Sequence, residues 1–114
     1  MKKRYLVEMG SGVDMHGGDS TKAACRALRD AVSHCSMVGL REIAGVTDYH
    51  KQVSLEIFIA VPAPESVDEA QVRAALPPLY EQVEIHIEAG GQSVPGSDPI
   101  IVANAAVIIR VEVG

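Results

Sequence analysis

Four stretches of the chain have the patterning of β-strands. Residues 4–9 predict a first strand, and residues 53–61 predict a second, which ends at Pro62 because proline cannot donate to a strand ladder. In residues 80–88, apolar residues alternate with charged residues and a histidine, as is typical of a strand with one buried face. Residues 100–113 are almost wholly apolar and predict a last strand.

Two other stretches have helical signals. From Ser20 onward apolar positions recur every three or four residues, and this helix should stop before Gly39. Asp19, Ser20 and Thr21 are each competent to cap its N-terminus. The apolar stripe comprises Ala24, Ala27, Leu28, Ala31, Val32 and Cys35. The segment Ser66–Glu69 matches a capping box, so a short helix is expected over residues 67–76.

The remaining segments are connections. Residues 42–46 form a short piece, followed by a polar break at residues 47–51. Three glycines and two prolines within residues 89–99 predict a long loop. The order β-α-β-α-β-β predicts an α/β or α+β two-layer sandwich, with both helices on one face of a four- to five-stranded sheet. A length of 114 residues fits a single domain, residues 1–114.

This layout leaves the second face of the sheet without cover from the chain. Phe58 and Ala60 point away from the helical side, and Glu56, Glu84, His86 and Glu88 share that face in the prediction. Such a face is either solvated or buried against another subunit. We expect a homo-oligomer, a trimer or higher, in which the glycine-rich loop completes sites at subunit junctions.

Composition and charge narrow the partners and the compartment. The net charge is −5, and the only basic run is residues 2–4, which argues against a nucleic-acid partner. No apolar stretch reaches the roughly 18 residues that span a bilayer, so a soluble cytoplasmic protein without a membrane partner is expected. Cys25 and Cys35 lie ten positions apart in one predicted helix, too far to form a disulfide.

The candidate chemistry lies in residues 10–19, which hold four glycines, two aspartates and a histidine between the first strand and the first helix. Glycines at this density indicate positive φ angles or a backbone that something approaches closely. The segment matches neither the Walker A loop nor the dinucleotide fingerprint, so a nucleotide cofactor is not expected. The expected ligand is a small polar molecule, contacted by Gly10, Gly12, Gly17, Thr21 and Ser93.

Three hypotheses fit these residues. In the first, Asp14 and His16, with Asp19, bind a divalent metal, and Glu84 and His86 join them if the fold brings that strand near. In the second, the chain is a hydrolase or proton-transfer enzyme. His16 then shuttles a proton, Asp14 orients it or acts as base, Lys22 assists as a general base, and Ser93 or Ser20 is the nucleophile. In the third, the chain is a non-catalytic oligomeric binding module.

The same segment carries a family pattern, Gly10-x-Gly12-x-Asp14-x-His16-Gly17. With it the chain resembles an uncharacterised conserved family of short proteins defined by a GxGxDxHG motif. The likeness continues through residues 19–27 and through residues 104–107. That family has no assigned function, so the resemblance implies membership but no reaction.

A second resemblance, of shape, is to ring-opening hydrolases of cyclic amides, whose single chain holds three similar α/β units around a central site built with Lys and Ser. The shared element is a turn of the form Glu8-x-Gly10-x-Gly12 that leaves a strand before a helix. The resemblance implies that a homotrimer of this chain could mimic that arrangement, with Lys22 and Ser93 as the Lys–Ser pair. Asp14 and His16 have no counterpart there.

Overall fold

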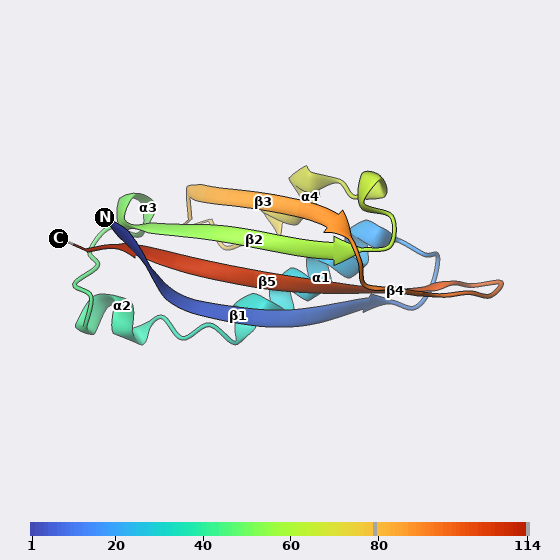
Figure 1. Cartoon of the computed structure of the whole chain (residues 1–114), viewed down its shortest axis with the longest axis horizontal. Coiled ribbons are helices and arrows are strands. Elements are labelled where there is room, and N and C mark those ends of the chain that lie inside the picture. Colours follow the sequence, from blue (N-terminus) through green and yellow to red (C-terminus); the bar gives the residue numbers. More distant parts are fainter. Residues whose placement is uncertain (79, 114) are drawn as a thin grey trace.

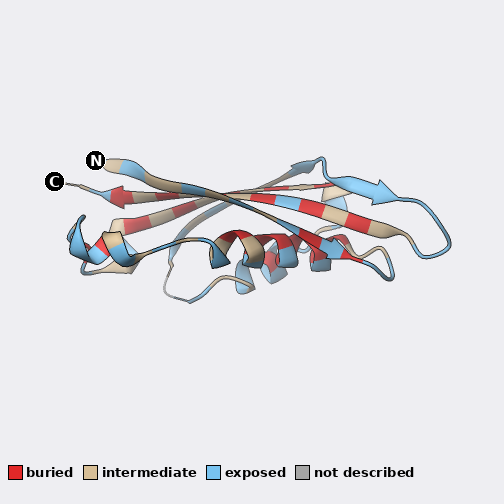
Figure 2. Ribbon diagram, turned by 90° about the horizontal axis from the view of Figure 1, so that it is seen from below, coloured by how far each residue is buried: buried red, intermediate tan, exposed pale blue. Residues whose placement is uncertain are grey.

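The computed structural model describes residues 1–78 and 80–113. It is a five-stranded sheet with its helices packed on one side, which confirms the predicted sandwich (Figures 1 and 2). The elements are β1 (Lys2–Asp14), α1 (Ser20–Ser33), α2 (Val38–Glu42), α3 (Tyr49–Gln52), β2 (Val53–Val61), a 3₁₀ turn η1 (Pro64–Ser66), α4 (Glu69–Ala74), β3 (Gln82–Ala89), β4 (Gln92–Val94) and β5 (Ile100–Glu112).

The sheet has the order β1-β5-β2-β3, and the short β4 pairs with β5. Strand β5 runs antiparallel to β1 and β2, whereas β2 and β3 are parallel to each other. Strands β1 and β5 are each 13 residues long, so the molecule is elongated along them and measures 54 × 21 × 20 Å. Both termini lie at one end, opposite the β4–β5 hairpin (Figure 1).

Strand β1 is longer than the sequence pattern predicts. It continues through Gly10, Gly12 and Asp14, which pair in register with Ala105, Ala103 and Ile101 of β5. The predicted loop over residues 10–19 is therefore wrong in its first half, because the long apolar β5 offers a pairing partner along the whole segment. Only residues 15–19 connect β1 to α1.

The two strand glycines let α1 lie directly on β1. A methyl group on Gly12 would come within 2.2 Å of the Ala27 nitrogen and 2.4 Å of the Ala23 carbonyl oxygen. On Gly10 it would come within 2.3 Å of the Ala31 nitrogen. Both contacts are with backbone atoms of a helix, which cannot move aside singly, so these glycines serve close helix–strand packing.

The core lies between α1 and the sheet. Every second residue of β2 is fully buried, and the same alternation continues on β5 (Figure 2). Alanines supply most of the helix side of this core, as expected for a chain without tryptophan whose helix lies close to its sheet. The largest fully buried side chains are Leu28, Leu40, Leu55, Ile57, Ile59 and Ile109.

Several predicted helix boundaries need correction. Helix α1 ends at Ser33, so Cys35 lies beyond it, and α2 occupies 38–42 rather than a piece at 42–46. The predicted polar break at residues 47–51 overlaps the four-residue α3, whose N-terminus is capped by the Asp48 carboxylate. Strand β3 begins at Gln82 instead of Tyr80, and the predicted loop 89–99 contains β4.

The predicted capping box at residues 66–69 is also wrong. Asp68 caps α4, since its carboxylate accepts hydrogen bonds from the backbone nitrogens of Ala70 and Gln71 at 3.0 and 3.4 Å. The Ser66 hydroxyl is used inside η1, where it donates to the Ala63 carbonyl oxygen at 2.7 Å. The helix is correspondingly shorter, Glu69–Ala74 in place of 67–76.

Candidate functional site

Asp14 lies at the end of β1 on the helix-covered face and is only 4% exposed. Its carboxylate accepts a hydrogen bond from the backbone nitrogen of Asp19 at 2.7 Å, and Arg26 Nη1 lies 3.6 Å away. Asp19 in turn caps α1 by accepting from the backbone nitrogen of Lys22 at 3.1 Å. Asp14 therefore ties the start of α1 to the strand below it.

His16 lies in a different environment. Its side chain is 86% exposed, and its Nδ1 is 2.6 Å from Oδ2 of Asp98 in the β4–β5 hairpin. The other oxygen of Asp98 accepts from the backbone nitrogen of Gly17 at 2.8 Å, where a φ of +87° favours glycine. The bond from His16, then that from Gly17, lowers the pKa of Asp98. We call this contact the His16–Asp98 clasp.

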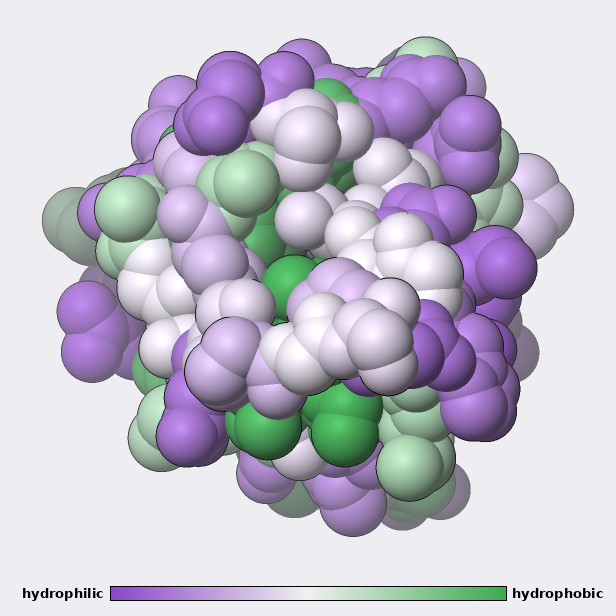
Figure 3. Space-filling model, turned by 90° about the vertical axis from the view of Figure 1, so that its right-hand side faces the viewer, coloured by the Kyte–Doolittle hydropathy of each residue, from purple (hydrophilic) through white to green (hydrophobic). Residues whose placement is uncertain are grey.

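The clasp closes the end of the molecule that carries the hairpin. Figure 3 views this end and shows apolar surface set among weakly polar residues. Three large apolar residues of these segments are exposed, Val13 by 37%, Met15 by 57% and Val94 by 40%. The clasp thus holds together two segments that expose apolar side chains.

The other residues predicted for this site are dispersed. The Thr21 hydroxyl oxygen accepts from the backbone nitrogen of Asp68 at 3.0 Å, which joins α1 to α4. Ser93 is exposed on β4, opposite Ile101, and no hydrogen bond links it to Lys22 among the described residues. Among the described residues, no hydrogen bond or ion pair joins the side chains of Asp14, His16 and Lys22 to one another, and Gly10 and Gly12 face α1.

A compact polar cluster lies instead on the uncovered face of the sheet. We define the open-face cluster as Glu56 on β2, Glu84 and His86 on β3, and Arg110 on β5. One oxygen of Glu56 is 2.9 Å from Arg110 Nη1 and the other is 2.9 Å from His86 Nε2. These bonds, the one from Arg110 first, lower the pKa of Glu56. Glu84 lies 3.7 Å from the same His86 nitrogen.

The imidazole of His86 is fixed from a second side by Phe58. Their ring centroids are 4.7 Å apart with an interplanar angle of 22°, a stacked arrangement. The parallel register of β2 and β3 sets these two residues opposite each other. The ring is therefore held by Glu56 at its Nε2 edge and by Phe58 at its face.

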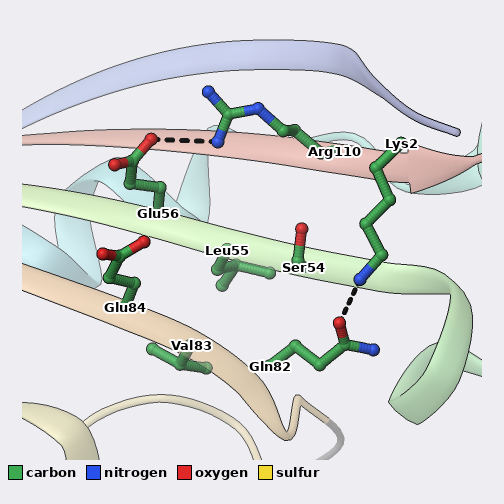
Figure 4. Close-up of a pocket in the computed structure, with 8 residues that line it drawn as sticks. All are labelled: Lys2, Ser54, Leu55, Glu56, Gln82, Val83, Glu84 and Arg110. Carbon is green, nitrogen blue, oxygen red and sulfur yellow. Dashed lines mark hydrogen bonds and ion pairs between the residues drawn. The ribbon is translucent and has the colours of Figure 1, made fainter.

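A depression of about 340 Å³ adjoins the open-face cluster. Figure 4 shows Arg110 and Lys2 on one side of it and Glu56 and Glu84 on the other, with Ser54 between the two cations. Lys2 also hydrogen-bonds the side-chain oxygen of Gln82 (Figure 4). The depression offers a small molecule charges of both signs.

The open-face cluster also contains the groups that a cation would need. The ligand atoms of Glu56, Glu84 and His86 all lie within 4.8 Å of one another, and among the described residues no other such group occurs. Arg110 already neutralises Glu56, which weakens the attraction for a metal. These residues cannot join Asp14 and His16, because β1 and β3 are opposite edges of the sheet, roughly 14 Å apart.

Beside the open-face cluster the uncovered face is apolar. On β1, Val7 is 43% and Met9 is 72% exposed. A second depression of about 170 Å³ lies between Met9, Phe58 and Ala106. Alternation in the sequence predicted that Glu56, Glu84 and His86 share this face. The sequence did not predict that Arg110 belongs to this cluster, because residues 100–113 are almost wholly apolar. Only the pairing of β5 with β2 brings Arg110 next to Glu56.

The structure also bears on membrane association. Within residues 1–78 and 80–113, no helix combines the length and apolar character needed to cross a bilayer.

Comparison with known proteins gives a family and a neighbour of unknown function. A solved structure described as an FtsZ-like protein of unknown function from Nostoc punctiforme is 37% identical, with a TM-score of 0.84 over 97% of both chains. No match was found among curated proteins. The family model described as "Conserved hypothetical protein (Lin0512_fam)" matches residues 4–109. The chain therefore belongs to this conserved hypothetical protein family.

Proposed function

We propose that this protein forms a homo-oligomer through the uncovered face of its sheet and binds a small polar molecule at the open-face cluster, beside the junction between copies. The observation that carries the proposal is the pairing, on one face, of exposed apolar side chains with an ordered ionic cluster. The free thiols of Cys25 and Cys35 support a reducing, cytoplasmic location.

The residues exposed on the uncovered face support self-association. Val7 and Met9 protrude from β1, which contributes an apolar strip of the kind that marks interaction surfaces. A second copy suits this face because the face carries charges of both signs. Arg110 and Lys2 keep free donors, and Glu84 and Glu88 are exposed on β3, so two copies can offset each other's charges.

Sedimentation equilibrium tests this half of the proposal. The wild-type chain is expected at a multiple of its 12.1 kDa mass, and Met9→Glu is expected to shift it to the monomer with an unchanged circular dichroism spectrum. Ile43→Glu is the matched control, since Ile43 is 87% exposed beside α2, outside the sheet. A wild-type monomer at about 100 μM, a concentration at which a specific interface would be populated, would contradict the proposal.

The ligand class follows from the lining of the 340 Å³ depression. Lys2 and Arg110 suit an anionic group, because each cation keeps donors beyond those used by Gln82 and Glu56. Glu84, 70% exposed on its side chain, suits a hydrogen-bond donor or a cationic group. A small molecule with both kinds of group, such as an amino acid, matches this division.

Thermal unfolding with a panel of amino acids and small carboxylates tests the ligand. At least one member is expected to raise the unfolding midpoint of the wild-type chain. Lys2→Gln and Glu84→Gln should abolish that shift, and Lys51→Gln, at an exposed lysine of α3, should retain it. Equal shifts in all variants, or no shift with any member, would overturn the assignment.

A second candidate function is proton transfer by His86. The Glu56 contact at one ring nitrogen and the Phe58 stack hold the imidazole in the way that a general base requires. This hypothesis places the chemistry at His86 rather than at Asp14, His16 and Lys22. Hydrolysis of p-nitrophenyl acetate should fall about 100-fold in His86→Gln and stay unchanged in His50→Gln. Equal rates in both variants would rule it out.

A further inference from the structure

A groove on the helical layer, between α1 and α4, gathers positive charge. Lys22, Arg26 and Arg29 line it from one side of α1, at spacings of four and three residues. The groove has a volume of about 220 Å³, and Thr21, Cys25 and Gln71 complete its lining. No acidic residue lines it within the described chain, although the net charge of the whole chain is −5.

Most donor groups of the cations that line the groove have no hydrogen-bond or ion-pair partner among the described residues. Lys22 and Arg29 make no side-chain hydrogen bond or ion pair with residues 1–78 or 80–113. Arg26 uses Nη1, which donates to the Val13 carbonyl oxygen at 2.6 Å and lies 3.6 Å from Asp14. Its remaining donors stay available, since a guanidinium has five.

The nearby carboxylates are bound elsewhere. Asp19 accepts from the backbone nitrogen of Lys22 as the cap of α1. Asp68 accepts from backbone nitrogens at the start of α4, and its second oxygen accepts from the Gln71 side chain at 3.1 Å. Neither carboxylate forms an ion pair with Lys22 or Arg29 in the described structure, so the charge of the groove is not offset by direct contacts.

Cys25 does not make the groove a nucleophilic site. Burial raises the pKa of its thiol and so disfavours the reactive thiolate; the nearby charge of Arg29 acts in the opposite direction, and those of Asp19 and Asp68 act in the same direction as burial. The thiol lies 3.7 Å from the Gln71 carbonyl oxygen. The groove thus offers cations, a hydroxyl and an amide, but no reactive group.

We propose that the groove between α1 and α4 binds a small anion with two or more negative charges, of the diphosphate class. Lys22 and Arg29 would contact the anion from either end of the groove, with the free donors of Arg26 between them. The volume lies below the range of about 300–1,000 Å³ for drug-sized ligands, which favours a compact anion. The site is separate from the open face, which lies on the other side of the sheet.

Isothermal titration with inorganic diphosphate at 150 mM NaCl tests this proposal. Saturable binding is expected with the wild-type chain. Arg29→Gln and Lys22→Gln should each weaken it about 10-fold or more, because each removes a charged contact. Lys51→Gln, an exposed cation outside the groove, should bind within about twofold of wild type. Met9→Glu should also bind normally, so failure here is distinguishable from failure of the open-face proposal.

Two outcomes would overturn the proposal. One is the absence of saturable diphosphate binding at this salt concentration. The other is equal weakening in Arg29→Gln and Lys51→Gln, which would indicate a nonspecific counter-ion effect only. Circular dichroism of each variant checks folding, and it should be unchanged because neither Lys22 nor Arg29 contributes a side-chain hydrogen bond to the described fold.

Discussion

The two faces of the sheet are built on opposite principles. On the covered face the residues in contact are small: Gly10 and Gly12 face alanines of α1, and the backbones of strand and helix are in close contact. The uncovered face instead carries long side chains, an ion-paired cluster and protruding apolar residues. The chain's most conspicuous motif therefore serves packing in its first half, whereas the ionic cluster of Glu56, His86 and Arg110 lies where no motif marks it.

The largest expected effect comes from adding a methyl group between β1 and α1 on the covered face. Gly12→Ala places a methyl group 2.2 Å from the Ala27 nitrogen, so α1 must move off the sheet. We expect a loss of about 3 kcal/mol or more in the free energy of unfolding, measured by urea denaturation. Ser11→Ala, on the neighbouring exposed position, should change it by less than about 0.5 kcal/mol. Equal stabilities would refute the packing role of Gly12.

A smaller effect is expected at Asp14 on the same face. Asp14→Ala leaves the Asp19 nitrogen without its acceptor and removes the carboxylate that forms an ion pair with Arg26, at a cost of about 1–3 kcal/mol. Asp14→Asn keeps an acceptor oxygen and should cost less. Thermal and urea unfolding of the two variants measure the difference. If Asp14→Ala were as stable as wild type, Asp14 would not be the anchor of α1.

The sequence predicted the periodic elements better than it predicted how far the strands pair and in what register. Alternation and helical spacing located β2 and the start of α1, because burial imposes those periods directly. The sequence did not predict that β1 continues through Gly10 and Gly12. Several glycines close together are as compatible with a loop as with a strand that packs closely under a helix. The gathering of Glu56 with Arg110 depends on the register of β5, which no local pattern encodes.

On the uncovered face, the contribution of Glu56 to stability should depend on pH. Arg110 and then His86 lower the pKa of Glu56, so its stabilising contribution is present above the ordinary glutamate pKa and is lost as pH falls through the lowered value. Glu56→Gln should therefore lower the unfolding midpoint at pH 7, and the difference from wild type should shrink in acid. Glu84→Gln, at a more exposed carboxyl, is the control. A difference independent of pH would mean that the carboxylate charge is not what Arg110 and His86 recognise.

The smallest effect is expected at the His16–Asp98 clasp, which belongs to neither face. Its partners are 86% and 51% exposed, so breaking it in His16→Ala should leave the global unfolding midpoint nearly unchanged. Its effect should be local, because Asp98 also holds the Gly17 nitrogen. Amide hydrogen exchange at Gly17 should quicken modestly in His16→Ala and strongly in Asp98→Ala, with Ser97→Ala as the control. A large drop in the global midpoint of His16→Ala would place the clasp among the packing contacts of the covered face, and the division between the faces would then no longer account for the whole motif.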